Sequence, residues 1–270
     1  MPARDFKKSG TAVVWRTSLI WPVASFLALL LLWQLAVTVF SVPSWLLPSP
    51  LQVLQALCQN LSLLLPATSV TLYEAFLGLV LATLIALLLA AVLAASEMLF
   101  KMVYPLLVAS QTVPIIVLAP VFLIWFGYSL LPKIVTVVLV CFFPIIVNTM
   151  SGLQMMDGEQ LAFFRQFGGS GRRLFFKVRL PAALPYFFSG LRIAATYSVM
   201  GAVIGEWLGA ASGIGRLLTV AQRAFDMPLV FACIALISLT SALMFLLVYL
   251  LERCVLRSGF QEEKQNFTGI

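Results

Sequence analysis

One long uncharged stretch in the middle of the sequence strongly restricts how this chain can fold. Residues 102–132 contain no charged side chain over 31 positions, whereas a helix needs only about 20 apolar residues to cross a bilayer. We interpret this stretch as one membrane-spanning helix followed by a turn. Similar runs recur along the 270 residues, of which 62% are hydrophobic and only 10% charged. Soluble domains carry about 25% charged residues, so the expected solvent is the bilayer.

The distribution of these runs predicts the fold class. The first run is longer than the apolar core of a signal peptide, and no small-residue cleavage pattern follows it, so we expect it to remain as a helix. We predict an all-α, polytopic membrane protein with a transmembrane domain at 19–252, between an N-terminal tail (1–18) and a C-terminal tail (253–270). Its six spans are expected at about 19–40, 70–96, 102–127, 133–156, 190–211 and 227–251.

The charge distribution supports six spans. The net charge of +7 comes from 17 Lys and Arg against 10 Asp and Glu. With the N-terminus in the cytoplasm, 14 Lys and Arg fall on the cytoplasmic side and 3 on the other, namely Lys133, Arg216 and Arg223. This bias is typical of membrane proteins, and it explains the basic excess without nucleic acid. It predicts that both termini are cytoplasmic.

Several kinds of chemistry are excluded by missing residues. The chain has no histidine, which excludes Ser-His-Asp and Cys-His catalysis and the HExxH metal motif. No lysine follows a glycine, so the phosphate-binding Gly-Lys dipeptide is absent as well. The four cysteines include no CxxC pair and are interpreted as small apolar residues. We therefore predict no catalytic residues, no metal site and no cofactor.

The cytoplasmic loop at 157–189 differs from the rest of the chain. Leu161, Phe164 and Phe167 have the spacing of one face of a short amphipathic helix, which the glycines at 168–171 interrupt. A phenylalanine-rich face must be buried against something. Two interpretations follow: the face packs on the protein's own helix ends or on lipid headgroups, or it docks a soluble partner.

The same loop resembles a known family. Gly168 is followed after nine residues by Val178-Arg179-Leu180-Pro181, which resembles the coupling loop of ATP-binding-cassette importer permeases. Ala162 and Phe163-Phe164 depart from the Glu-Ala-Ala start of that loop. The resemblance implies a coupling helix that docks an ATPase subunit through Leu161, Phe164, Arg165, Phe167, Gly168, Val178, Leu180 and Pro181.

Other short motifs extend the resemblance over most of the chain. They include Leu47-Pro48-Ser49-Pro50, Gln111-Thr112-Val113-Pro114, Trp125-Phe126-Gly127 and Gly205-Glu206-Trp207. Their order is similar to the nitrate, sulfonate and taurine branch of inner-membrane permeases, which includes permeases for thiamine pyrimidine precursors. The resemblance implies a type I importer fold, a homodimer, two ATPase subunits and an external solute-binding protein. Sulfonate, taurine, nitrate and a pyrimidine precursor all remain open as substrates.

Polar residues and prolines inside the spans are candidates for the translocation pathway. Interior prolines break backbone hydrogen bonds, and broken helices are tolerated where they face protein or a water-filled cavity. The alternative is a kink in a lipid-facing helix. The candidate pathway residues are Gln111, Thr112, Pro114, Pro120, Asn148 and Glu206.

Glu206 leaves two interpretations open. It lines an outward vestibule or gate, where it could pair with Arg216 or Arg223, or it reaches the outer headgroups. Glu74, at the start of the second span, is expected to have an interfacial or helix N-terminal role and not to form a facing pair with Glu206. Without such a pair of acids an intramembrane enzyme is disfavoured. A secondary transporter is also disfavoured, because no repeat relates residues 1–135 to 136–270.

The outer segments suggest where the binding protein makes contact. Ser49-Pro50 has the pattern of a helix start, and leucines recur behind it at helical spacing. This helix lies on the membrane surface or extends the second span. We expect the binding protein to contact the loop at 41–65 and the loop at 210–226.

Overall fold

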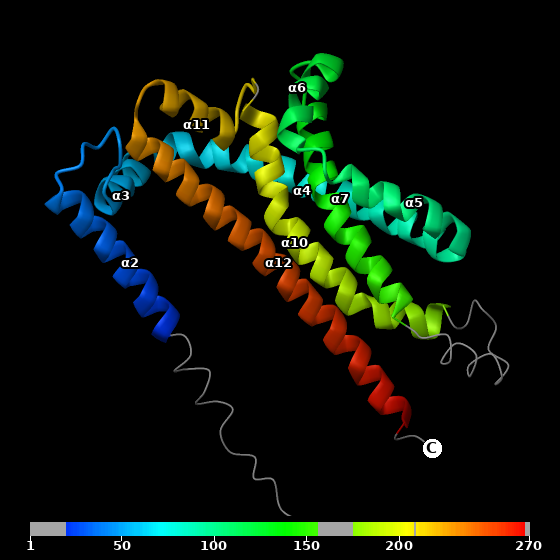
Figure 1. Cartoon of the computed structure of the whole chain (residues 1–270). Helices are drawn as coiled ribbons and strands as arrows, with labels where there is room; N and C mark the ends of the chain where they lie inside the picture. The colour runs from blue at the N-terminus through cyan, green and yellow to red at the C-terminus, as the bar shows by residue number, and fades with distance from the viewer. Residues whose placement is uncertain (1–19, 156–174, 208, 268–270) are drawn as a thin grey trace, which may run out of the picture.

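All regular secondary structure in the described part of the chain is helical. The computed structural model describes residues 20–155, 175–207 and 209–267, and no strand occurs among them. Figure 1 shows their arrangement. In chain order the elements are α2 (Ile20–Val39), α3 (Pro50–Gln59), α4 (Leu61–Ala95), α5 (Glu97–Ser110), α6 (Ile115–Phe126), α7 (Leu131–Gln154), a π-helical turn η1 (Phe175–Arg179), α10 (Leu180–Trp207), α11 (Ile214–Arg223) and α12 (Met227–Phe267).

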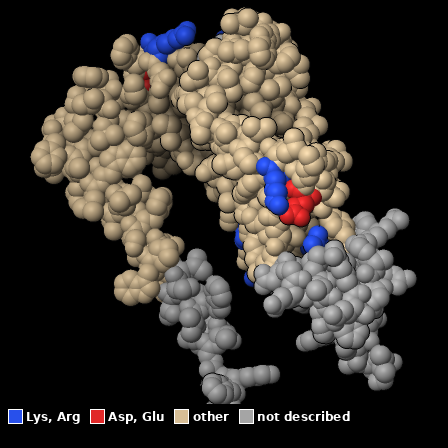
Figure 2. Space-filling view, turned by 45° about the vertical axis from the view of Figure 1, so that its right-hand side comes forward, with Lys and Arg blue, Asp and Glu red and all other residues tan. Residues whose placement is uncertain are grey.

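Five of these helices are long and apolar enough to cross a membrane. They are α2, α4, α7, α10 and the first 30 residues of α12. The pair α5 and α6 passes the same test only when taken together, which makes up to six spans in the described residues. Most of the described surface in Figure 2 is uncharged. The prediction of an all-α polytopic membrane protein is confirmed.

The third predicted span, 102–127, is not one helix. α5 and α6 meet at an angle of 94°, with Gln111, Thr112 and Val113 between them and Pro114 as the residue that precedes α6. Pro114 cannot donate a backbone hydrogen bond and restricts the residue before it to extended conformations. Pro114 itself is extended, with ψ at 121°. The uncharged stretch therefore holds two short helices where a single one was expected.

The core lies where α7 packs against α10, with α4 and α12 beside them. Small residues allow the close approach, since a Cβ at Gly190 would meet the carbonyl oxygen of Pro144 and one at Gly201 would meet the backbone of Val137. Membrane helices associate through such small-residue contacts, because burial from water contributes little inside lipid. These helices form the rigid frame that positions the site below. Buried members include Ala82, Ala86, Ala90, Ile145, Ile146, Ala194, Ala195 and Ala202.

α3 and α11 lie together at one end of the frame (Figure 1). α3 begins as expected, with Pro50 in its first turn and a capping box between Ser49 and Gln52. It is separate from α4, which begins at Leu61, nine residues before the predicted start of the second span. A second apolar cluster joins this end, formed by Val53, Ala56, Leu64, Ile214, Leu218, Ala221, Leu229, Val230, Ala232 and Cys233.

At the opposite end of the frame, α7 ends, α10 begins and α12 ends. α12 runs from the α11 end to the end where α7 stops and α10 begins (Figure 1). There Arg192 of α10 and Glu252 of α12 form an ion pair at 3.4 Å, and the Arg253 guanidinium lies 5.1 Å from the centre of the Tyr249 ring. The frame thus has two distinct ends, one bearing α3 and α11 and one where α7 ends and α10 begins.

Candidate functional site

The predicted coupling residues are only partly within the described structure. Leu161, Phe164, Arg165, Phe167 and Gly168 lie outside the described residues. Among the others, Val178 is half-buried in η1, and the two residues that open α10, Leu180 and Pro181, are exposed. Their role in docking an ATPase stays a prediction.

The candidate pathway residues Gln111, Thr112, Pro114 and Pro120 are all exposed in the single chain. Gln111 caps the end of α5, and the Thr112 hydroxyl donates to the Ala109 carbonyl at 2.8 Å. The backbone at this break is irregular, within a segment that has the composition of a span. Such backbone is tolerated at membrane depth only where protein or water covers it.

Asn148 is half-buried within α7. Its Nδ2 donates to the Pro144 carbonyl at 2.7 Å within α7, and a Cβ at Gly190 would press on its side chain. Asn148 therefore bonds within α7, one turn after Pro144, where α7 packs closely on α10. A role in the pathway stays a prediction.

Glu206 is buried, with 1% of its surface exposed. The Thr71 hydroxyl donates to its Oε1 at 2.6 Å, and the Gly215 backbone N–H donates to its Oε2 at 2.6 Å. The interpretation that Glu206 reaches the outer headgroups is wrong, because α4 and α11 enclose its carboxylate. Within the described residues no ion pair joins Glu206 to Arg216 or Arg223.

The first turn of α11 explains the position of Glu206. The leading N–H groups of a helix lack internal partners and favour a negative charge. Gly215 donates to Glu206, and the Ile214 N–H donates to the Thr71 hydroxyl at 2.9 Å. Gly213 precedes them with φ at +111°, and a Cβ there would strike the Glu206 carboxylate. The Gly-Ile-Gly sequence thus lets α11 begin directly on a buried acid.

Glu74 and Lys133 extend this arrangement. Lys133 of α7 forms an ion pair with Oε1 of Glu74 at 2.5 Å, and the side chains are 11% and 2% exposed. Glu206 interacts electrostatically with both of them. The expectation that Glu74 and Glu206 do not form a facing pair is therefore wrong. We call Thr71, Glu74, Lys133 and Glu206 the buried polar cluster.

Sequence reasoning missed three of the four members of this cluster. Glu74 and Lys133 lie 59 positions apart, each at the edge of an apolar run, and nothing local pairs them. Thr71 resembles any other helical threonine. The available signal was the helical spacing of Thr71 and Glu74, which places both on one face of α4.

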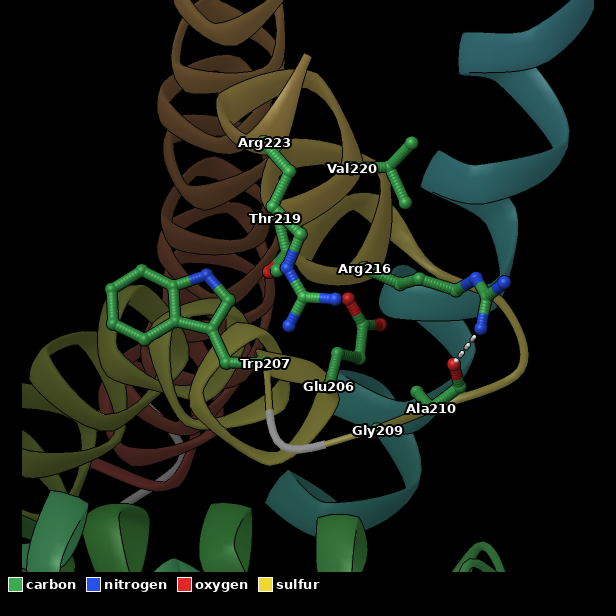
Figure 3. Close-up of a pocket in the computed structure, with 8 residues that line it drawn as sticks. All are labelled: Glu206, Trp207, Gly209, Ala210, Arg216, Thr219, Val220 and Arg223. Atoms are coloured by element: carbon green, nitrogen blue, oxygen red, sulfur yellow. Dashed lines mark hydrogen bonds between the residues drawn. The ribbon is translucent and has the colours of Figure 1, made fainter. Parts of the chain in front are cut away.

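A pocket of about 190 Å³ adjoins the cluster, lined by residues of α10, α11 and the segment between them (Figure 3). Arg216 and Arg223 line it together with Glu206 and Trp207. Figure 3 shows the Arg216 guanidinium turned to the Ala210 carbonyl, to which it donates at 2.7 Å. Within the described residues no group of three or more His, Cys, Asp or Glu could hold a metal ion.

Known proteins resemble this chain over most of its length. The family model "Binding-protein-dependent transport system inner membrane component" matches residues 78–257. The formylaminopyrimidine transport permease protein ThiX of Halalkalibacterium halodurans is 40% identical over 87% of this chain and 94% of its own length. The riboflavin transport system permease protein RibX of Chloroflexus aurantiacus is 35% identical over 88% and 91%. A putative aliphatic sulfonates transport permease protein of Bacillus subtilis is 27% identical over 90% and 87%.

The apolar spans, the family match and these relatives agree. They confirm the predicted permease and place the chain in the inner membrane as a multi-pass protein. Its role is transport and not catalysis. The chain belongs to the family of binding-protein-dependent transport system inner membrane components, as the permease subunit of an ATP-binding-cassette importer.

Proposed function

We propose that two copies of this chain line a translocation pathway at the break between α5 and α6. The observation that carries the proposal is the exposed, non-helical backbone at Gln111–Pro114, inside a segment without charged residues. Lipid cannot satisfy such backbone groups, but a second copy or a water-filled pathway can. α5 also has no buried residue in the single chain, which leaves its faces free for a neighbouring subunit.

The two ends of the frame fit two different partners. Three basic residues lie toward the α11 end, namely Lys133, Arg216 and Arg223. Arg192 and Arg253 lie toward the other end, to which the sequence assigns most of the Lys and Arg. An excess of Lys and Arg is typical of the cytoplasmic side. We infer that the termini are cytoplasmic, that the loop at 157–189 docks an ATPase subunit, and that an external solute-binding protein contacts α3 and α11.

The solute is best supported as a nitrogen heterocycle. Two relatives at 35% identity or more, covering at least 87% of this chain, are named for formylaminopyrimidine and riboflavin, and both compounds are nitrogen heterocycles. The relative named for aliphatic sulfonates is 27% identical. The uncharged break also suits a solute without a strong negative charge, since no basic side chain lies between positions 101 and 133.

Cysteine cross-linking tests the shared pathway. In a chain whose four native cysteines are replaced, Gln111→Cys should form a cross-linked dimer in membranes. Leu88→Cys is the control, because it is 69% exposed on the regular helix α4, which needs no protein partner in lipid. Failure of Gln111→Cys to cross-link, or equal cross-linking at both positions, would contradict the proposal.

Uptake tests the solute class. Cells that express the permease with its ATPase and binding protein should accumulate labelled formylaminopyrimidine, and unlabelled alkanesulfonate should not compete. Competition by the sulfonate at equal concentration would reverse the assignment. Docking of the ATPase is tested separately by co-purification, which Gly168→Asp should weaken. Unchanged co-purification would refute the role of this loop.

A further inference from the structure

The buried polar cluster contains more negative than positive charge. Glu74 and Glu206 are each 1% exposed and Lys133 is 9% exposed, so full ionisation would leave one uncompensated negative charge among α4, α7 and α10. Burying an unpaired charge is costly, and two carboxylates that share a site commonly hold one proton between them. Arg216 and Arg223 of α11 line the adjacent pocket, but neither forms an ion pair with Glu206 in the described structure.

Hydrogen-bond donors are distributed unequally over the two carboxyl groups. Both oxygens of Glu206 accept a hydrogen bond, one from Thr71 and one from the Gly215 N–H. Oε1 of Glu74 accepts from Lys133. Oε2 of Glu74 is buried and has no partner. Glu74 lies one turn after Thr71 on α4, and Thr71 bonds to Glu206, so Glu206 is the acid next to Glu74.

Two ionised carboxylates cannot bond to each other, because both only accept. We propose that the buried polar cluster is a proton-binding site, in which Glu74 carries a proton on Oε2 and donates it to the Glu206 carboxylate. The proton gives the orphan oxygen a hydrogen bond. It also balances the charge, with Glu206 negative, Lys133 positive and Glu74 neutral. The neutral cluster then holds the first turn of α11 against α4, α7 and α10.

Substitution of Glu74 by Gln mimics the proposed state. The amide oxygen can accept from Lys133, and the amide NH₂ group can donate to Glu206 as the carboxyl group does. Glu74→Gln should therefore fold and melt within a few degrees of the native chain. Glu74→Ala removes both bonds and should melt at a clearly lower temperature. Unfolding of Glu74→Gln to the same extent as Glu74→Ala would overturn the proposal.

Infrared spectroscopy observes the proton directly. The full-length permease in lipid near neutral pH should show the carbonyl band of a protonated carboxyl group, which shifts in D₂O. Glu74→Gln should lose this band. Glu97→Gln should keep it, because Glu97 is an exposed acid paired with Lys101 at 2.7 Å. Absence of the band from the native chain, or its survival in Glu74→Gln, would overturn the proposal.

The dependence of stability on pH gives a second measurement. Unfolded carboxyl groups are ionised near neutral pH, so the folded chain binds one more proton than the unfolded chain. Stability should then fall as the pH rises above neutrality, because the folded state loses its extra proton. Glu74→Gln lacks this proton and should not show the fall. Parallel melting profiles of the two chains would also overturn the proposal.

Discussion

Thr71 of α4 donates its hydroxyl to Glu206 of α10 over 2.6 Å, across 135 positions of sequence. The same hydroxyl accepts the N–H of Ile214 at 2.9 Å. One threonine therefore connects three helices at the α11 end of the frame. These two bonds to other helices are buried, where hydrogen bonds are costly to lose because water cannot replace the missing partner.

Thr71→Val keeps the shape of the side chain and removes both bonds. We expect the free energy of unfolding to fall by about 1–3 kcal/mol, the range for buried groups left without a partner. Thr83→Val is the matched control, since its hydroxyl bonds only to the Leu79 carbonyl within α4. Thermal melting of the purified chains checks the difference, and equal melting of the two variants would contradict it.

Lys133→Met tests the contribution of the Lys133 charge to the buried polar cluster. Removal of this cation leaves the negative charge of the cluster uncompensated, and removing one partner of a buried charge pair typically costs about 3–5 kcal/mol. Lys101→Met is the control, because Lys101 pairs with Glu97 on the surface, where such pairs contribute little. Membrane yield and melting should fall for Lys133→Met alone. A Lys133→Met chain as stable as the control would show that the pair is dispensable.

The general architecture could be predicted because its signals are local. Apolar runs and basic flanks are read along the chain, and the all-α polytopic fold and permease role inferred from runs and motifs are confirmed. The break at Pro114 was foreseeable as a disturbance but not as a 94° bend, because a proline does not fix the direction of the next helix. The hydrogen-bond partner of Glu206 could not be predicted, because Thr71 is brought to it by tertiary packing alone.

Gly213→Ala tests how closely α11 approaches the buried acid. Gly213 has φ at +111°, and the added Cβ would strike the Glu206 carboxylate, which Thr71 and Gly215 hold in place. Gly127→Ala is the control, because Gly127 also has a positive φ of +68° but open space around it. Backbone strain alone costs about 1–3 kcal/mol, so the loss of melting temperature should be larger at Gly213. Equal losses of melting temperature would mean that backbone strain, and not the collision with Glu206, destabilises Gly213→Ala.

The packing of α4, α7 and α10 is tested by substitutions at Gly78, Val137 and Gly201. A Cβ at Gly78 would overlap the side chain of Val137, whereas a Cβ at Gly201 would meet the Val137 Cα at 3.0 Å. Gly78→Ala and Gly201→Ala should each destabilise the chain, since overpacking costs about 1–3 kcal/mol. Val137→Gly removes the whole side chain, including the Cβ that lies 2.5 Å from the Cβ added at Gly78, but leaves the backbone where it is.

The second substitution should therefore rescue one variant and not the other. Gly78→Ala combined with Val137→Gly should be more stable than the sum of the two single changes predicts, by a coupling of about 0.5–3 kcal/mol. Gly201→Ala combined with Val137→Gly should be close to additive, because its main contact is with the backbone. Double-mutant cycles on melting or denaturant unfolding measure both couplings. Rescue of Gly201→Ala to the same extent would mean that α7 and α10 can move apart, which contradicts a rigid frame around the buried polar cluster.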